Sequence, residues 1–79
     1  MLNDKLQAVF RDVFDNDTIV ISDATTAKDI EGWDSLSHVT LVLAVERKFG
    51  IRIKPEAAAT LENVGQLKAL LKSLGVKDE

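Results

Sequence analysis

The chain has 79 residues, a net charge of −3, one histidine and no cysteine. This length allows one domain with a modest core, and the missing cysteine excludes disulfides and thiolate metal sites from the sequence. With a single histidine, we also expect no metal site. No stretch approaches the roughly 20 apolar residues of a membrane span, and no early apolar run resembles a signal peptide. We therefore expect a cytoplasmic protein, and a monomer.

The charge is unevenly distributed along the chain. Residues 15–34 contain six acidic residues and one lysine, whereas residues 35–79 contain five acidic and seven basic residues. No basic stripe is present that could displace the counterions of a phosphate backbone, so nucleic acid is not an expected partner. The acidic segment favours partner proteins with basic surfaces, although such charge more commonly forms only a solvated loop.

The first element is predicted to be an amphipathic helix over residues 3–14, with Asn3 as its N-cap. A long loop, 15–34, follows it, and its isoleucines are expected to attach it to the core. The apolar residues with helical spacing are Leu2, Leu6, Val9, Phe10, Val13 and Phe14, and the loop isoleucines are Ile19, Ile21 and Ile30.

The second helix is predicted over residues 35–49, with Asp34 as N-cap and Gly50 as a left-handed C-terminal cap. It has apolar residues on two opposite sides, whereas a surface helix needs only one apolar face. We expect one side to face the core and the other to contact a partner. The first side contains Leu41, Val42, Val45 and Phe49, and the second contains Leu36, Val39 and Leu43.

Two further helices complete the predicted fold. Pro55 begins a short helix, 55–59, because proline suits the first helical position. Asn63 and Gln66 form a capping-box pattern at the start of a final helix, 63–74. The fold class is therefore all-α: one domain, 1–79, forming a small four-helix bundle with three main helices, one short helix and a long first loop.

Ser35 opens the second helix, where backbone N–H groups and the helix dipole favour an anion such as a phosphate. A serine at this position can also serve only in local hydrogen bonds. His38 lies three residues later, but no third group orients it and the chain is too small for a substrate cleft, so a Ser–His nucleophile is not expected. We expect no catalytic residue and a packed or half-exposed His38.

The stretch Gly32-Trp33-Asp34-Ser35-Leu36, continued by Val39, Leu41-Val42 and Glu46 through Ile51, closely resembles the acyl carrier proteins and their peptidyl and D-alanyl relatives. The resemblance covers nearly the whole chain. It implies a non-catalytic carrier with 4′-phosphopantetheine, donated by coenzyme A, on Ser35, which holds acyl or aminoacyl groups as thioesters. It also implies that Asp34 helps the transferase to hold magnesium and coenzyme A.

The resemblance also implies the partners: a phosphopantetheinyl transferase, an acyl- or aminoacyl-loading enzyme, and a downstream acyltransferase or synthase. Leu36, Val39 and Leu43 would contact these enzymes, together with Trp33. The pathway is expected to be fatty-acid-like or specialised. Fatty-acid carriers usually have acids two and five residues after the serine, where this chain has Ser37 and Thr40, so the specialised pathway fits better. The alternative hypothesis is an unmodified helical interaction module that uses the same apolar patch.

Overall fold

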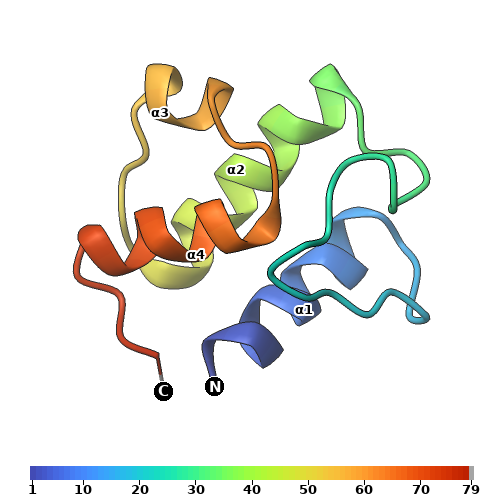
Figure 1. Cartoon of the computed structure of the whole chain (residues 1–79), viewed down its shortest axis with the longest axis horizontal. Helices are drawn as coiled ribbons and strands as arrows, with labels where there is room; N and C mark the ends of the chain where they lie inside the picture. Colours follow the sequence, from blue (N-terminus) through green and yellow to red (C-terminus); the bar gives the residue numbers. More distant parts are fainter. Residues whose placement is uncertain (79) are drawn as a thin grey trace.

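The computed structural model describes residues 1–78, and its regular elements are four helices with no strand in this range, which confirms the predicted all-α fold class (Figure 1). The helices α2 and α3 have the residue ranges expected from the sequence, whereas α1 and α4 begin and end one residue away from them. None of the helices within residues 1–78 combines the length and the apolar character of a membrane span. The helices are α1 (Leu2–Val13), α2 (Ser35–Phe49), α3 (Pro55–Ala59) and α4 (Val64–Ser73).

The start of α1 differs from the prediction, because Met1 and not Asn3 is its N-cap. Helix formation from Leu2 brings that side chain into the core, where it is 1% exposed. Asn3 lies in the first turn, and its side chain joins other segments instead. Its amide donates to the Ile21 carbonyl oxygen at 3.4 Å, and its Oδ1 accepts from Lys68 Nζ at 2.6 Å. The prediction of an Asn3 cap was therefore wrong.

The start of α4 has half of the predicted capping box. Asn63 is the N-cap and its Oδ1 accepts from the Gln66 backbone N–H at 2.8 Å. The Gln66 side chain accepts from the N–H of Glu62 at 2.8 Å, and not from that of Asn63. At the other end, Leu74 is the C-cap and Gly75 takes a positive φ of 96°.

The core lies where α1, α2 and α4 meet, and the long loop closes one side of it. As expected, the three loop isoleucines are buried. The buried apolar side chains are Leu2, Leu6, Val9, Phe10, Ile19, Ile21, Ile30, Leu41, Val45, Ile53, Ala58, Val64, Leu67 and Leu71.

The long loop is attached to the first turn of α4, whose backbone N–H groups have no partner within the helix. Val64 N donates to the Thr25 carbonyl oxygen at 2.9 Å, and Gly65 N donates to that of Asp23 at 2.8 Å. A Cβ on Gly65 would lie 3.0 Å from the Asp23 carbonyl oxygen, so the absence of a side chain permits this approach. Lys68 Nζ then binds Asp23 Oδ1 at 2.6 Å.

Replacing Asp23 with asparagine should lower the thermal stability at neutral pH but not in strong acid. The hydrogen bond and charge of Lys68 hold the pKa of Asp23 below its ordinary value. A carboxylate with a lowered folded-state pKa stabilises the fold above its unfolded value of about 3.9, and this contribution is lost as the pH falls through the folded-state pKa. Circular dichroism melts of wild type, Asp23→Asn and a control, Asp17→Asn, would measure this. An unchanged difference at about pH 2 would contradict the assignment.

Candidate functional site

The candidate site is built around the N-terminus of α2. Asp34 is the N-cap, as predicted, and its Oδ1 accepts from Leu36 N at 3.0 Å and Ser37 N at 2.9 Å. Ser37 completes a capping box: its Oγ accepts from Asp34 N and donates to the Gly32 carbonyl oxygen, both at 2.7 Å. The turn before α2 is therefore held by the Asp34 side chain, which binds the first turn of the helix, and by the Ser37 side chain, which binds back to the turn.

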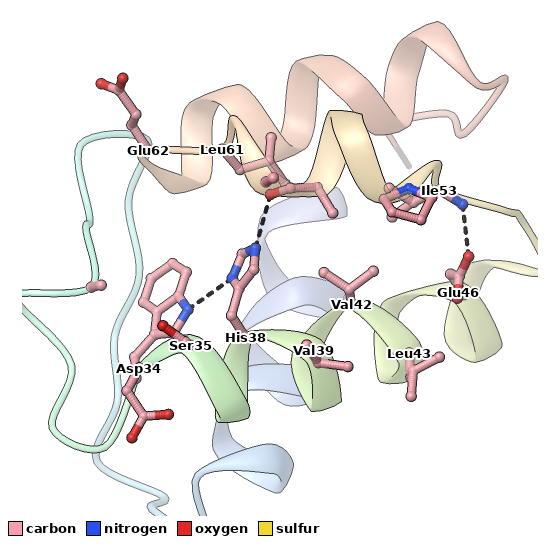
Figure 2. Close-up of a pocket in the computed structure, with 15 residues that line it drawn as sticks. Asp34, Ser35, His38, Val39, Val42, Leu43, Glu46, Ile53, Leu61 and Glu62 are labelled. Atoms are coloured by element: carbon pink, nitrogen blue, oxygen red, sulfur yellow. Dashed lines mark hydrogen bonds between the residues drawn. The ribbon is translucent and has the colours of Figure 1, made fainter.

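Ser35 is the first residue of α2 and is exposed. Its Oγ forms no hydrogen bond with any residue in the described part of the chain, whereas the hydroxyl of Ser37 is engaged on both sides. Of these two neighbouring serines, only Ser35 presents a hydroxyl group that is free to react. Figure 2 shows Ser35 beside Asp34 and His38.

The carboxyl group of Asp34 is ionised at neutral pH. The hydrogen bond that it accepts from the Ser37 backbone N–H is the main cause that lowers the pKa of Asp34, and the hydrogen bond from the Leu36 backbone N–H lowers it further. Only Oδ1 is used in the cap, and Oδ2 forms no hydrogen bond with residues 1–78. A negative oxygen is therefore exposed on the residue that precedes Ser35.

Behind Ser35, a chain of hydrogen bonds links the loop, α2 and α3 (Figure 2). Trp33 Nε1 donates to His38 Nδ1 at 3.0 Å, and His38 Nε2 lies 3.0 Å from the Ala58 carbonyl oxygen. Because the indole N–H can only donate, Nδ1 of His38 is the acceptor in this pair, and Nε2 is the nitrogen that donates to the Ala58 carbonyl oxygen. The indole also packs edge-on against Phe10, with ring centroids 5.3 Å apart, and lies 6.3 Å from Phe14.

These hydrogen bonds exclude a role for His38 as the base for Ser35. A general base needs a free nitrogen within hydrogen-bond distance of the hydroxyl group. Both ring nitrogens of His38 are engaged, with Trp33 and Ala58. The sequence indicated a packed or half-exposed histidine but not its partners. His38 therefore links the loop and α2 to α3.

Replacing His38 with leucine should destabilise the domain by about 1–3 kcal/mol, because the Trp33 N–H and the Ala58 carbonyl lose their partner. Urea unfolding followed by far-ultraviolet circular dichroism would measure this, because Trp33 is the only tryptophan and a fluorescence readout would be lost in the comparison variant. Trp33→Phe serves as a comparison that removes the donor and retains an aromatic ring. Equal midpoints for wild type and His38→Leu would show that the hydrogen-bond chain contributes no stability.

The exposed side of α2 is apolar over three residues. Leu36, Val39 and Leu43 are 83%, 59% and 51% exposed, whereas Leu41 and Val45 on the opposite side are buried. The two opposed apolar faces predicted from the sequence are therefore present. Trp33, expected as a partner contact or, alternatively, as a ring that caps the loop against the core, is half-buried and packs against the core.

A groove of about 760 Å³ runs along α2 from Ser35, below α3 and the segment that leads to α4 (Figure 2). Two contacts hold α3 over it: His38 binds the Ala58 carbonyl oxygen, and Glu46 Oε2 accepts from Ile53 N at 2.7 Å. Most of the wall is apolar. Its apolar residues are Ala27, Trp33, Val39, Val42, Leu43, Ile53, Pro55, Ala58, Ala59 and Leu61.

Histidine, aspartate and glutamate side chains do not gather into a group of three or more that could hold a metal ion anywhere in residues 1–78. The exposed oxygen of Asp34 is thus a single ligand at most. A metal ion at this position would need further ligands from another molecule.

Comparison with known proteins identifies the family. The family described as "Phosphopantetheine attachment site" matches residues 4–71. The acyl carrier protein of Helicobacter pylori strain 26695 is 37% identical over 67 residues, which cover 84% of this chain and 85% of the relative. That of Helicobacter acinonychis is 39% identical with the same coverage.

Solved structures agree with this result. The solution NMR structure of holo acyl carrier protein from Geobacter metallireducens superimposes with a TM-score of 0.85 at 40% identity. The match covers 94% of this chain and 86% of that chain.

A small helical domain with a phosphopantetheine attachment site is a carrier of covalently tethered groups. Such a domain presents its cargo to other enzymes and catalyses nothing itself. The chain belongs to the acyl carrier protein family. Its prosthetic group is 4′-phosphopantetheine, and its partners include a phosphopantetheinyl transferase and biosynthetic enzymes.

Proposed function

We propose that Ser35 is the residue that carries 4′-phosphopantetheine, and that the holo form carries acyl, or aminoacyl, intermediates as thioesters. The observation that supports this most directly is the free, exposed hydroxyl group of Ser35 at the start of α2. Ser37, the nearest other serine, is engaged with Asp34 and Gly32. The helix N-terminus also stabilises the negative charge of a phosphodiester.

In the proposed modification, Ser35 Oγ forms a bond with the phosphorus atom that bears the pantetheine in coenzyme A. The bond to the second phosphate breaks, so adenosine 3′,5′-bisphosphate leaves and the hydroxyl proton passes to a base. That base must belong to the transferase, because both nitrogens of His38 are occupied. Once bound, the group supplies a thiol that holds acyl groups as thioesters.

Asp34 is proposed to assist the transferase. Its Oδ1 holds the first turn of α2, while the unengaged Oδ2 can contribute one ligand to a magnesium ion that the transferase and coenzyme A also bind. Magnesium prefers such carboxylate and phosphate oxygens. One carboxyl group would thus cap the helix through Oδ1 and bind the magnesium ion beside Ser35 through Oδ2.

Asp34→Asn separates these two roles. Asparagine caps helices as well as aspartate does, so we expect a change in unfolding free energy within about 0.5 kcal/mol. The loss of charge should lower kcat/KM of the transferase by roughly tenfold, the effect of one charge-assisted contact. Melting temperature and the initial rate of modification give the two readouts. A normal rate with Asp34→Asn would contradict the magnesium role.

The apolar groove beside Ser35 supports an acyl cargo. Its wall is largely apolar, and it begins at the residue to which the arm would be attached. Burial of an acyl chain there would contribute about 0.8 kcal/mol for each methylene. We propose that the carrier works in the cytoplasm. We also propose that it serves a specialised pathway, because Ser37 and Thr40 replace the acids usual in carriers for fatty acid synthesis.

The test is the intact mass of the wild-type protein after incubation with coenzyme A, magnesium and a broad-specificity phosphopantetheinyl transferase. We expect the gain of one phosphopantetheine, located on the peptide that contains Ser35. No gain with a folded sample, across several transferases, would reject the proposal. The unmodified interaction module, which the family match does not favour, would then become the better hypothesis.

A further inference from the structure

The exposed side of α2 carries no free negative charge. The apolar residues Leu36, Val39 and Leu43 occupy it, and Thr40 and Arg47 lie within the same arc of the helix at 100° per residue. All five side chains are exposed. The charge that a molecule would meet on this side is therefore the positive charge of Arg47.

The one acidic residue of α2, Glu46, points elsewhere. It is half-buried, and its Oε2 accepts from Ile53 N at 2.7 Å, on the side of the helix that faces the groove. Arg47 and Lys48 are both exposed, and neither forms an ion pair with any residue between 1 and 78. Their charges are not neutralised within the described structure.

The positive charge continues beyond the helix. Residues 47–54 contain four basic residues and no acidic residue, and Arg52 and Lys54 are exposed in the segment between α2 and α3. The segment before α2, residues 15–34, has the opposite sign, with six acidic residues and one lysine. The carrier is therefore polarised along α2, negative at the Ser35 end and positive at the Phe49 end.

We propose that the enzymes that act on this carrier cover α2 with an apolar pocket for Leu43 and Val39, flanked by carboxylates that face Arg47 and Lys48. This rests on the proposed function, since an enzyme that reaches Ser35 must cover Leu36 one residue further along the same helix. Complementary charges orient such partners and accelerate their association. The distribution of charge along α2 then determines the orientation in which a partner binds.

Other occupants of this face fit the observations less well. An anionic lipid surface would be repelled by the net charge of −3 and by the acidic segment next to α2. A second copy of the chain would have to cover Leu36, and so would obstruct access to Ser35. An enzyme whose carboxylates are confined to the flank that faces Arg47 and Lys48 avoids both difficulties, because those carboxylates then stay away from the acidic segment 15–34.

The test compares two phosphopantetheinyl transferases as probes, one with an acidic and one with a basic surface around its carrier-binding site. The carrier variants are Arg47→Glu with Lys48→Glu, and the neutral pair Arg47→Gln with Lys48→Gln in case the reversal weakens the helix end. The matched control, Lys5→Glu with Lys77→Glu, makes the same change in net charge at exposed positions near the two chain ends, where neither lysine forms an ion pair with residues 1–78.

With the acidic transferase, we expect kcat/KM to fall roughly fivefold or more on charge reversal and less on neutralisation, with kcat nearly unchanged. The wild-type rate should also fall with added salt, and the control pair should behave as wild type. With the basic transferase, kcat/KM should rise when the charges of Arg47 and Lys48 are reversed.

Equal effects of the α2 pair and the control pair, or a wild-type preference for the basic transferase, would overturn the proposal while Ser35 is still modified. Self-association in sedimentation that Leu43→Gln abolishes, or binding of the wild type to vesicles of anionic phospholipid, would also overturn it. Failure of the proposed function would give a different result, because neither transferase would then modify the wild-type carrier.

Discussion

Ser35→Ala is expected to abolish the gain of phosphopantetheine and to leave the fold intact. The hydroxyl group forms no hydrogen bond within residues 1–78 and the side chain is exposed, so its removal breaks no contact. Alanine also suits a helical position, and exposed substitutions of this kind usually change stability by less than about 0.5 kcal/mol. Intact mass after transferase treatment and a thermal melt measure both effects.

Ser37→Ala is the matched control for this prediction. The Ser37 hydroxyl joins Asp34 N to the Gly32 carbonyl oxygen, so its loss should cost about 0.5–2 kcal/mol, as for other helix caps. The folded variant should still gain one phosphopantetheine. A modified Ser35→Ala, or a Ser37→Ala that stays folded but unmodified, would show that Ser35 is not the attachment site.

Phe10→Ala should have the largest effect on stability. The Phe10 ring is 0% exposed and lies against the rings of Trp33 and Phe14, with centroids 5.3 Å and 6.0 Å away. Truncation of a buried phenylalanine to alanine costs about 3–5 kcal/mol, a large part of the 5–15 kcal/mol that stabilises a typical domain. We expect the melting temperature to fall by roughly 12 °C or more.

The control for this prediction is Val20→Ala, whose side chain is 75% exposed. Its melting temperature should stay within a few degrees of that of the wild type. Trp33 fluorescence offers a second readout, because the indole packs against Phe10 and should become more exposed in Phe10→Ala. A melting temperature like that of the wild type would mean that Phe10 is not part of the main core.

The helix ends that could be predicted from the sequence are those marked by residues with strong local preferences. Asp34 and Gly50 delimit α2, and Pro55 begins α3, because capping, left-handed φ and a fixed proline φ act within a few residues. The start of α1 could not be found in this way. Burial of Leu2 and the contacts of Asn3 with Ile21 depend on packing against distant segments.

The candidate site likewise contains residues that could be predicted from the sequence and contacts that could not. Ser35 and Asp34 could be selected from the sequence, because their positions at a helix start have a local physical meaning. The partners of His38 could not be predicted. Ala58 lies 20 residues away, and the spacing of apolar residues carries no information about a hydrogen bond between a side chain and a distant backbone carbonyl. The contact between Glu46 Oε2 and Ile53 N likewise joins the end of α2 to the segment before α3, and no local pattern in the sequence marks it.

The chain ends lie next to each other at one side of the bundle, whereas α2 begins at the opposite side (Figure 1). Leu2 N donates to Asp78 Oδ1 at 3.1 Å, which joins the two ends. A resin, a fluorophore or a fused protein attached at either terminus would therefore leave the serine end of α2 unobstructed. The domain can be immobilised by its ends while enzymes in solution still reach it.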